Sequence, residues 1–121
     1  IKLLLEHGKI DCQTLIVLDE PENHLHPQWQ LELAKLIVLL IKDLDVKFVI
    51  TTHSPSFLLA LETYSNIYEI AERTNYYYSE LSDNNYNVKL ESVNHEKDRI
   101  HYAINKPFID INNLFERYSE E

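Results

Sequence analysis

The chain has 121 residues, of which 45% are hydrophobic and 26% are charged, and its formal net charge is −9. This length suits one domain with a single core, and the excess of acidic side chains argues against a broad nucleic-acid-binding surface on these residues alone. The longest apolar run, residues 36–41, is far shorter than the ~20 residues that a membrane-spanning helix needs, so we expect no contact with a membrane.

The sequence contains only one cysteine and only one glycine, and each of these counts excludes a structural feature. The single cysteine, Cys12, excludes an internal disulfide and is typical of a reducing compartment, so we expect a cytoplasmic protein. The single glycine, Gly8, excludes both common glycine-rich phosphate-binding loops within the chain. The sequence starts without methionine in an apolar, helix-like stretch, which indicates a piece of a longer protein.

The first half of the chain alternates between helix-like and strand-like stretches. Residues 1–7 predict a short helix, and residues 14–18 form a continuous aliphatic run, typical of a strand buried on both faces of a parallel sheet. Pro27 suits the first position of a helix whose apolar residues recur at helical spacing as far as Leu44. Residues 46–52 predict a second strand. Together they predict a βαβ unit whose strands are parallel neighbours.

The rest of the chain is less regular. Ser54 suits the cap of another helix, with Pro55 in its first turn. The elements expected after it are a third strand at residues 66–72, a hairpin formed by residues 76–78 and 88–91 around a turn at 82–85, a strand through Ile100, Tyr102 and Ile104, and a short helix at 111–118, capped by Asp110 and preceded by Pro107. We therefore expect an α/β domain at residues 1–72, with parallel strands flanked by helices, and a β-rich extension with a terminal helix at residues 73–121.

Polar side chains follow both strands of the predicted βαβ unit. Asp19 and Glu20 come directly after the first strand, and His53 follows the second. Because the carboxyl ends of neighbouring parallel strands meet at one edge of a sheet, we expect the acidic pair and the histidine to share one crevice. Adjacent side chains at a strand end point in different directions, so Asp19 and Glu20 need not have the same role.

These residue types suit the hydrolysis of a nucleotide. Phosphoryl transfer needs Mg²⁺ to neutralise the phosphates and a group that orients the attacking water. Asp19 suits the metal, through water, because Mg²⁺ keeps much of its hydration shell. Glu20 suits the attacking water, and His53 suits a contact with the terminal phosphate.

The sequences of these segments resemble motifs of a known family. Residues 15–21, Leu-Ile-Val-Leu-Asp-Glu-Pro, resemble the Walker B motif of ABC-type P-loop ATPases, and residues 22–27 resemble the D-loop region that follows it. Residues 50–55, Ile-Thr-Thr-His-Ser-Pro, resemble the switch-histidine motif. Asp-Glu-Pro-Glu-x-x-Leu-His-Pro followed by Thr-Thr-His-Ser-Pro is similar to the RecF-like and OLD-like "AAA family" ATPases of DNA repair and phage defence. Transporters usually carry Ser-Ala-Leu-Asp in the D-loop, where this chain has Asn-His-Leu-His at residues 23–26.

The resemblance implies a role for each matching residue. Asp19 would hold the hydration shell of Mg²⁺, Glu20 would polarise the attacking water, and His53 would contact the γ-phosphate. Asn23 and His24 would face the nucleotide of a partner subunit, in a homodimer whose heads enclose ATP.

The resemblance covers residues 1–70, and three family motifs have no match in this chain. They are the Walker A lysine loop, the Q-loop and the signature motif, all of which lie upstream of Walker B in this family. The chain therefore resembles the C-terminal half of a P-loop ATPase head. It would hydrolyse ATP as part of a larger protein and be inactive alone, and any DNA or nuclease partner would bind through other regions.

Two other interpretations stay open. Without a phosphate loop, the chain could be a non-catalytic interaction module or a remnant of an ATPase. Alternatively, Asp19, Glu22, His24 and His26 could form the site of a metal-dependent hydrolase, because His-x-His beside carboxylates can bind zinc or another transition metal. Against the metal site, no second His or Cys cluster has matching spacing, and His26 before Pro27 suits a helix cap.

Overall fold

The computed structural model describes residues 13–82 and 87–119. The chain divides into two compact units, Ile1–Arg73 and Thr74–Glu121. The helix expected at residues 1–7 and residues 83–85 of the expected hairpin turn lie outside the described residues.

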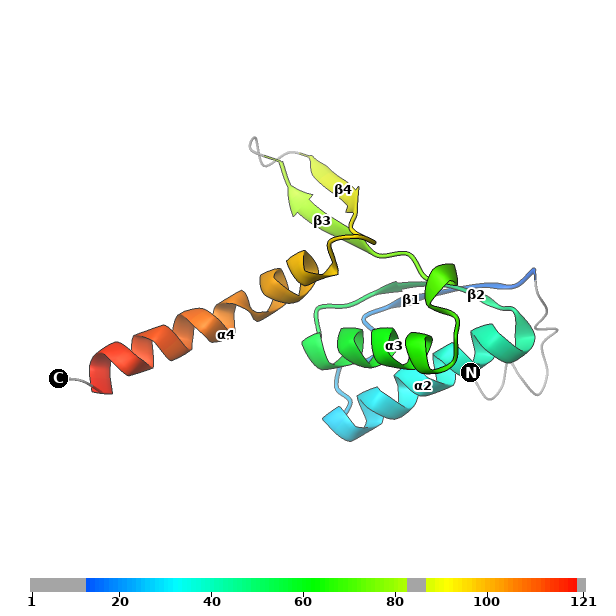
Figure 1. Cartoon of the computed structure of the whole chain (residues 1–121), viewed down its shortest axis with the longest axis horizontal. Helices are drawn as coiled ribbons and strands as arrows, with labels where there is room; N and C mark the ends of the chain where they lie inside the picture. The colour runs from blue at the N-terminus through cyan, green and yellow to red at the C-terminus, as the bar shows by residue number, and fades with distance from the viewer. Residues whose placement is uncertain (1–12, 83–86, 120–121) are drawn as a thin grey trace. The chain divides into compact units, whose positions relative to one another are not determined.

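The first unit contains a parallel two-stranded sheet. Strand β1 (Leu15–Asp19) pairs with β2 (Lys47–Thr51), in a register that sets Leu15 opposite Lys47 and Asp19 opposite Thr51. Helix α2 (Pro27–Leu44) connects the two strands, as Figure 1 shows. The predicted βαβ unit with parallel neighbouring strands is therefore confirmed.

The two α-helices that the described residues of this unit form both begin where the sequence predicts. The imidazole Nδ1 of His26 accepts a hydrogen bond from the backbone N–H of Gln28 at 3.3 Å, and Pro27 is the first helical residue of α2. Helix α3 (Pro55–Ile67) has Ser54 as its cap, whose hydroxyl accepts from the backbone N–H of Phe57 at 3.2 Å. Each cap satisfies a backbone donor that has no partner inside the helix.

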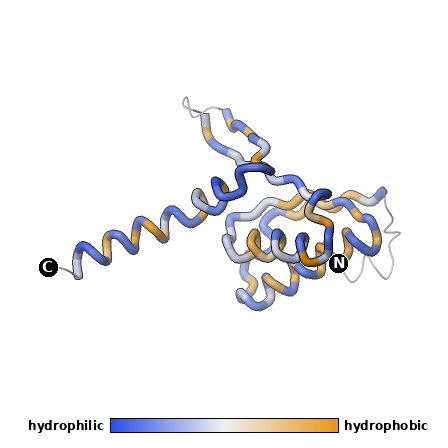
Figure 2. The backbone as a smooth tube through the Cα atoms, in the orientation of Figure 1, coloured by the Kyte–Doolittle hydropathy of each residue, from blue (hydrophilic) through white to orange (hydrophobic). Residues whose placement is uncertain are grey.

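The core of the unit lies between the two helices and one face of the sheet. Its buried members are Ala34, Ile37, Phe57 and Ala60, and the partly buried Leu18, Phe48 and Ile50 of the strands pack against them. Both helices lie on the same side of the sheet (Figure 1), and apolar residues run along the strands as well as the helices (Figure 2). This packing fixes where the two strands end.

The other face of the sheet does not match the expectation. Among the described residues, nothing covers Leu15, Val17 and Val49, which are 59%, 67% and 51% exposed. Strand β1 is therefore not buried on both faces here, because α2 and α3 both cover the same face. Trp29, near the start of α2, is also exposed, at 64%.

The third strand predicted at residues 66–72 is wrong. Helix α3 continues to Ile67, and a 3₁₀ turn, η1 (Ala71–Arg73), follows it. The rings of Tyr64 and Tyr68 stack with their centroids 6.4 Å apart, the contact that residues four apart make along a helix. Of the residues predicted as a strand, Ile67 is the last residue of α3 and Tyr68 is its cap, whereas Ile70 lies in the turn before η1.

The second unit consists of a hairpin and a long helix. Strand β3 (Tyr77–Leu81) pairs antiparallel with β4 (Val88–Ser92), which confirms the predicted hairpin. Helix α4 (Lys97–Ser119) follows, so the strand predicted through Ile100, Tyr102 and Ile104 is wrong. The helix predicted at residues 111–118 is confirmed as the end of α4, which begins well before Asp110, so Asp110 is not its cap. Ile100 is buried and Tyr102 is 61% exposed, because residues two apart point to different sides of a helix. Pro107 lies inside α4 instead of before a helix.

Candidate active site

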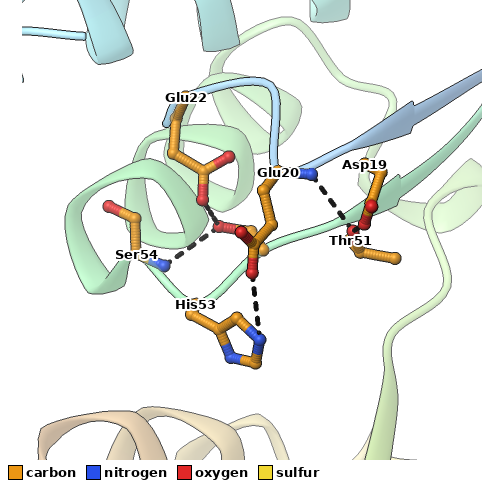
Figure 3. A network of polar contacts seen from close by, with 7 residues as sticks. Asp19, Glu20, Glu22, Thr51, His53 and Ser54 are labelled. Atoms are coloured by element: carbon orange, nitrogen blue, oxygen red, sulfur yellow. Dashed lines mark hydrogen bonds and ion pairs between the residues drawn. The ribbon is translucent and has the colours of Figure 1, made fainter. Parts of the chain in front are cut away.

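The site begins at the paired ends of β1 and β2. The hydroxyl of Thr51 donates a hydrogen bond to Oδ1 of Asp19, directly across the sheet. The backbone N–H of Glu20 donates to the carbonyl oxygen and to the hydroxyl of Thr51, at 3.1 Å each. These contacts hold Asp19 and the start of the following turn against β2, and Figure 3 shows those of the Thr51 side chain.

A tight turn then leads from β1 to α2. The backbone N–H of Asn23 donates to the carbonyl of Glu20 at 3.0 Å, and that of Leu25 donates to Glu22 at 3.0 Å. Glu20 and His24 have φ values of 45° and 65°, in the left-handed region that non-glycine residues seldom adopt. Backbone strain of this kind collects at functional sites, which supports a functional role for the turn.

Glu20 and His53 meet at the open edge of the sheet. The imidazole Nε2 of His53 lies 3.1 Å from Oε1 of Glu20. The side chain of His53 is 88% exposed and that of Glu20 is 37% exposed, so both are accessible to a ligand. The structure thus brings together two of the three residues that the sequence assigned to one crevice. The third, Asp19, contacts Thr51 instead and does not line the pocket that Glu20 and His53 share.

Unlike the side chain of Glu20, the side chain of Glu22 points into the protein. It is only 5% exposed, and its Oε1 accepts a hydrogen bond from the hydroxyl of Thr52. The same hydroxyl accepts from the backbone N–H of Ser54 at 3.0 Å, and the hydroxyl of Ser54 donates to Oε1 of Gln30 at 2.8 Å. The sequence pattern predicts no role for Thr52 or Gln30, and it places Glu22 in the D-loop segment and in the alternative metal site.

The consecutive threonines were the sequence signal that could have revealed this network. Successive side chains along a strand point to opposite faces. Thr51 and Thr52 therefore reach different carboxylates, Asp19 at the end of β1 and Glu22 in the turn after it. One hydroxyl at the end of β2 and one directly after it thus each pair with one carboxylate.

Asn23 and His24 are both exposed in the same turn. They line an open pocket of about 250 Å³ together with Glu20, Glu22, Gln30, His53 and Ser54. The pocket joins the turn after β1 to the loop after β2. A contact of Asn23 and His24 with a partner subunit stays a prediction.

The donor set fits a hydrated magnesium ion better than a transition metal. Asp19 offers an exposed carboxylate at the edge of the sheet, the type of oxygen ligand that Mg²⁺ prefers. Within residues 13–82 and 87–119, no group of three or more His, Cys, Asp or Glu side chains is arranged to hold a metal ion. Glu22 points inward and His26 caps α2, so the cluster that a metal-dependent hydrolase would need is not formed.

None of the helices in the described part of the chain combines the length and the apolar character that a membrane crossing requires.

Comparison with known proteins finds a family model that matches part of the chain. Residues 3–58 match the family model of an AAA ATPase domain. The matched segment contains β1, α2, β2 and the start of α3, and therefore every side chain of the candidate site. The match supports an AAA-type ATPase fragment.

Two curated relatives carry the same name, Septu protein PtuA. The one from Bacillus mycoides (strain KBAB4) is 31% identical over 113 residues, which cover 89% of this chain and 15% of the relative. The one from Bacillus thuringiensis is 40% identical over 50 residues, which cover 41% of this chain and 12% of the relative. The chain thus spans a small part of the length of these relatives. No solved structure matches it.

Proposed function

We propose that this chain forms the Walker B, D-loop and switch-histidine part of an ABC-type ATPase of the RecF/OLD-like group. The larger protein would bind and hydrolyse ATP in DNA repair or phage defence. The observation that carries the proposal is the 3.1 Å approach of Glu20 and His53, at the ends of neighbouring parallel strands. The match of residues 3–58 to an AAA ATPase domain supports it.

Each side chain at the edge of the sheet has a separate task in this proposal. Asp19, held by the Thr51 hydroxyl, binds the water shell of Mg²⁺. When bound, Mg²⁺ neutralises charge on the phosphates. Glu20 accepts a hydrogen bond from the attacking water and orients it toward the γ-phosphate. His53 donates a hydrogen bond to that phosphate. Its contact with Glu20 also keeps the Glu20 carboxylate and the His53 imidazole close to each other.

The proposal also assigns the exposed turn. Asn23 and His24 face the nucleotide of a second subunit, in a homodimer that encloses ATP between its heads. Their exposure beside the pocket is compatible with such a contact. DNA or a nuclease partner would bind through regions outside this chain.

A non-catalytic interaction module is the second candidate, and the composition favours it for the chain alone. With one glycine, these residues contain no glycine-rich loop to hold a triphosphate. We therefore expect the 121-residue chain to show no ATP turnover by itself. Turnover by the isolated chain that Glu20→Gln abolishes would contradict this expectation.

ATP turnover of the full-length protein, with and without DNA, tests the proposal. Glu20→Gln keeps the size of the side chain but removes the charge that orients water, so we expect kcat to fall by about 10²-fold or more. Glu32→Gln is the matched control, because Glu32 is an exposed residue of α2 that the site does not use. Equal turnover in wild type and Glu20→Gln would reject the proposal.

A further inference from the structure

His53 needs its position fixed by something other than its own packing. Its side chain is 88% exposed, so few neighbours restrict its rotation. Its contact with Glu20 depends on where the loop between β2 and α3 places its backbone. The residues on either side of it, Thr52 and Ser54, are both partly buried and hydrogen-bonded.

These flanking hydrogen bonds lead to Glu22. The Thr52 hydroxyl accepts from the backbone N–H of Ser54 and donates to the buried carboxylate of Glu22. The loop is therefore closed on itself across His53 and joined to the turn that follows β1. Figure 3 shows the carboxylates of Glu20 and Glu22 reaching the same loop from that one turn.

The burial of Glu22 is unusual for a side chain of this kind. Glutamate is almost never buried unless it is paired, and Glu22 is 5% exposed. Its Oε2 has no hydrogen-bond partner among the described residues. Half of a buried carboxylate is thus left unsatisfied while the other half accepts from one hydroxyl, an arrangement that a purely structural turn does not require.

We propose that Glu22 is a positioning residue that acts on His53 through Thr52. Its buried carboxylate holds the Thr52 hydroxyl, the hydroxyl holds the backbone of Ser54, and the loop so fixed presents the imidazole of His53 to Glu20. Glu22 touches no reacting group in this arrangement. The effect on catalysis rests on the proposed function, whereas the effect on the position of His53 does not.

Substitutions at Thr52 separate the hydrogen bond from the shape of the side chain. Thr52→Val keeps the shape and removes the hydroxyl, whereas Thr52→Ser keeps the hydroxyl and serves as the matched control. In the full-length protein, we expect Thr52→Val to lower kcat for ATP by between about ten- and a hundredfold with little change in KM, since a small misplacement of a catalytic group has effects of this size. Thr52→Ser should restore kcat to within a few-fold of wild type.

A second readout does not depend on ATP turnover. In protein labelled with ¹³C-histidine, the ring signal of His53 is identified by its absence in His53→Asn. At one fixed pH, we expect this signal to move or broaden in Thr52→Val and to stay at the wild-type position in Thr52→Ser. A protein with no ATP turnover in the wild type but with this pattern of signals would reject the proposed function and support the positioning role.

Two results would overturn the positioning role. One is a His53 signal in Thr52→Val that coincides with that of wild type; the other is an equal displacement in Thr52→Ser. If Thr52→Val does not fold, Glu22→Gln replaces it, because the amide oxygen still accepts from Thr52 but without the strength of a charged acceptor. An unchanged His53 signal in Glu22→Gln would then reject the role of the Glu22 carboxylate.

Discussion

At the scale of single residues, the Thr51 hydroxyl makes two hydrogen bonds where the paired strands end. Its hydroxyl donates to Asp19 and accepts from the backbone N–H of Glu20. We expect Thr51→Val to lower the free energy of unfolding by about 1 kcal/mol, the net contribution of a hydrogen bond of this kind. Urea unfolding measures the change. Thr63→Val, an exposed substitution on α3, should have a smaller effect, and equal losses in the two variants would contradict the assignment.

The residues also differ in how far the sequence reveals them. The convergence of Glu20 and His53 follows from two rules, that short apolar runs joined by one helix pair in parallel and that sites form at the carboxyl ends of such strands. The inward direction of Glu22 follows from neither rule. It depends on the left-handed backbone of Glu20 and His24, which a single sequence does not show.

At the scale of elements, the start of α2 depends on an unusual cap. The imidazole of His26 accepts a hydrogen bond from the backbone of Gln28, as asparagine or serine does at most helix starts. We expect His26→Ala to lower the free energy of unfolding by about 1 kcal/mol. His26→Asn should keep most of this contribution, because asparagine also caps helices. Thermal unfolding of the three proteins checks the order. A stable His26→Ala together with a metal-dependent wild type would instead favour a ligand role for His26.

In the second unit, Glu91 of β4 has a carboxyl group whose pKa is clearly shifted. The Lys89 ammonium beside Glu91, with Arg99 as a second partner, holds the pKa of Glu91 below its usual value of 4.5. A carboxyl whose pKa is lower in the folded state stabilises the fold above its unfolded pKa and loses that contribution as pH falls through the folded pKa. Stability of this unit should therefore decline below about pH 4.5 in part because of Glu91.

Unfolding measured from neutral pH downward tests this assignment. We expect Glu91→Gln to be less stable than wild type at neutral pH and to lose less stability on acidification, since the amide does not titrate. Glu80→Gln is a useful comparison, because Glu80 approaches Arg99 less closely, at 3.6 Å against 2.8 Å for Glu91. Parallel pH profiles for wild type and Glu91→Gln would contradict the assignment.

The elements that sequence reasoning missed share one cause. The strands predicted at residues 66–72 and 100–104 both rest on short windows, where strand and helix patterns are hard to separate. The first window covers the end of α3 and the start of η1, and the second lies inside α4. In α4, Ile100 and Ile104 alternate with Tyr102, but they are also four residues apart and share one face of a helix.

At the scale of the whole molecule, the described residues of the first unit build one layer of helices on one face of a two-stranded sheet. The exposed Leu15, Val17 and Val49 show that a run typical of a strand buried on both faces is covered on one face here, because α2 and α3 lie on the same side of the sheet. The parallel pairing, both helix caps and the hairpin were predictable from sequence. Each depends on residues or elements that follow one another along the chain. The covering of the second face depends on residues that the pattern of a single strand does not identify.

The central claim is that Glu20 and His53 act as one site in ATP hydrolysis. A double-mutant cycle on kcat in the full-length protein, with Glu20→Gln, His53→Ala and the double variant, tests it most directly. If the two residues work on the same step, each single variant should lose activity, and the double variant should be little worse than the more damaged single variant. Losses that multiply in the double variant, or single variants as active as wild type, would contradict the claim.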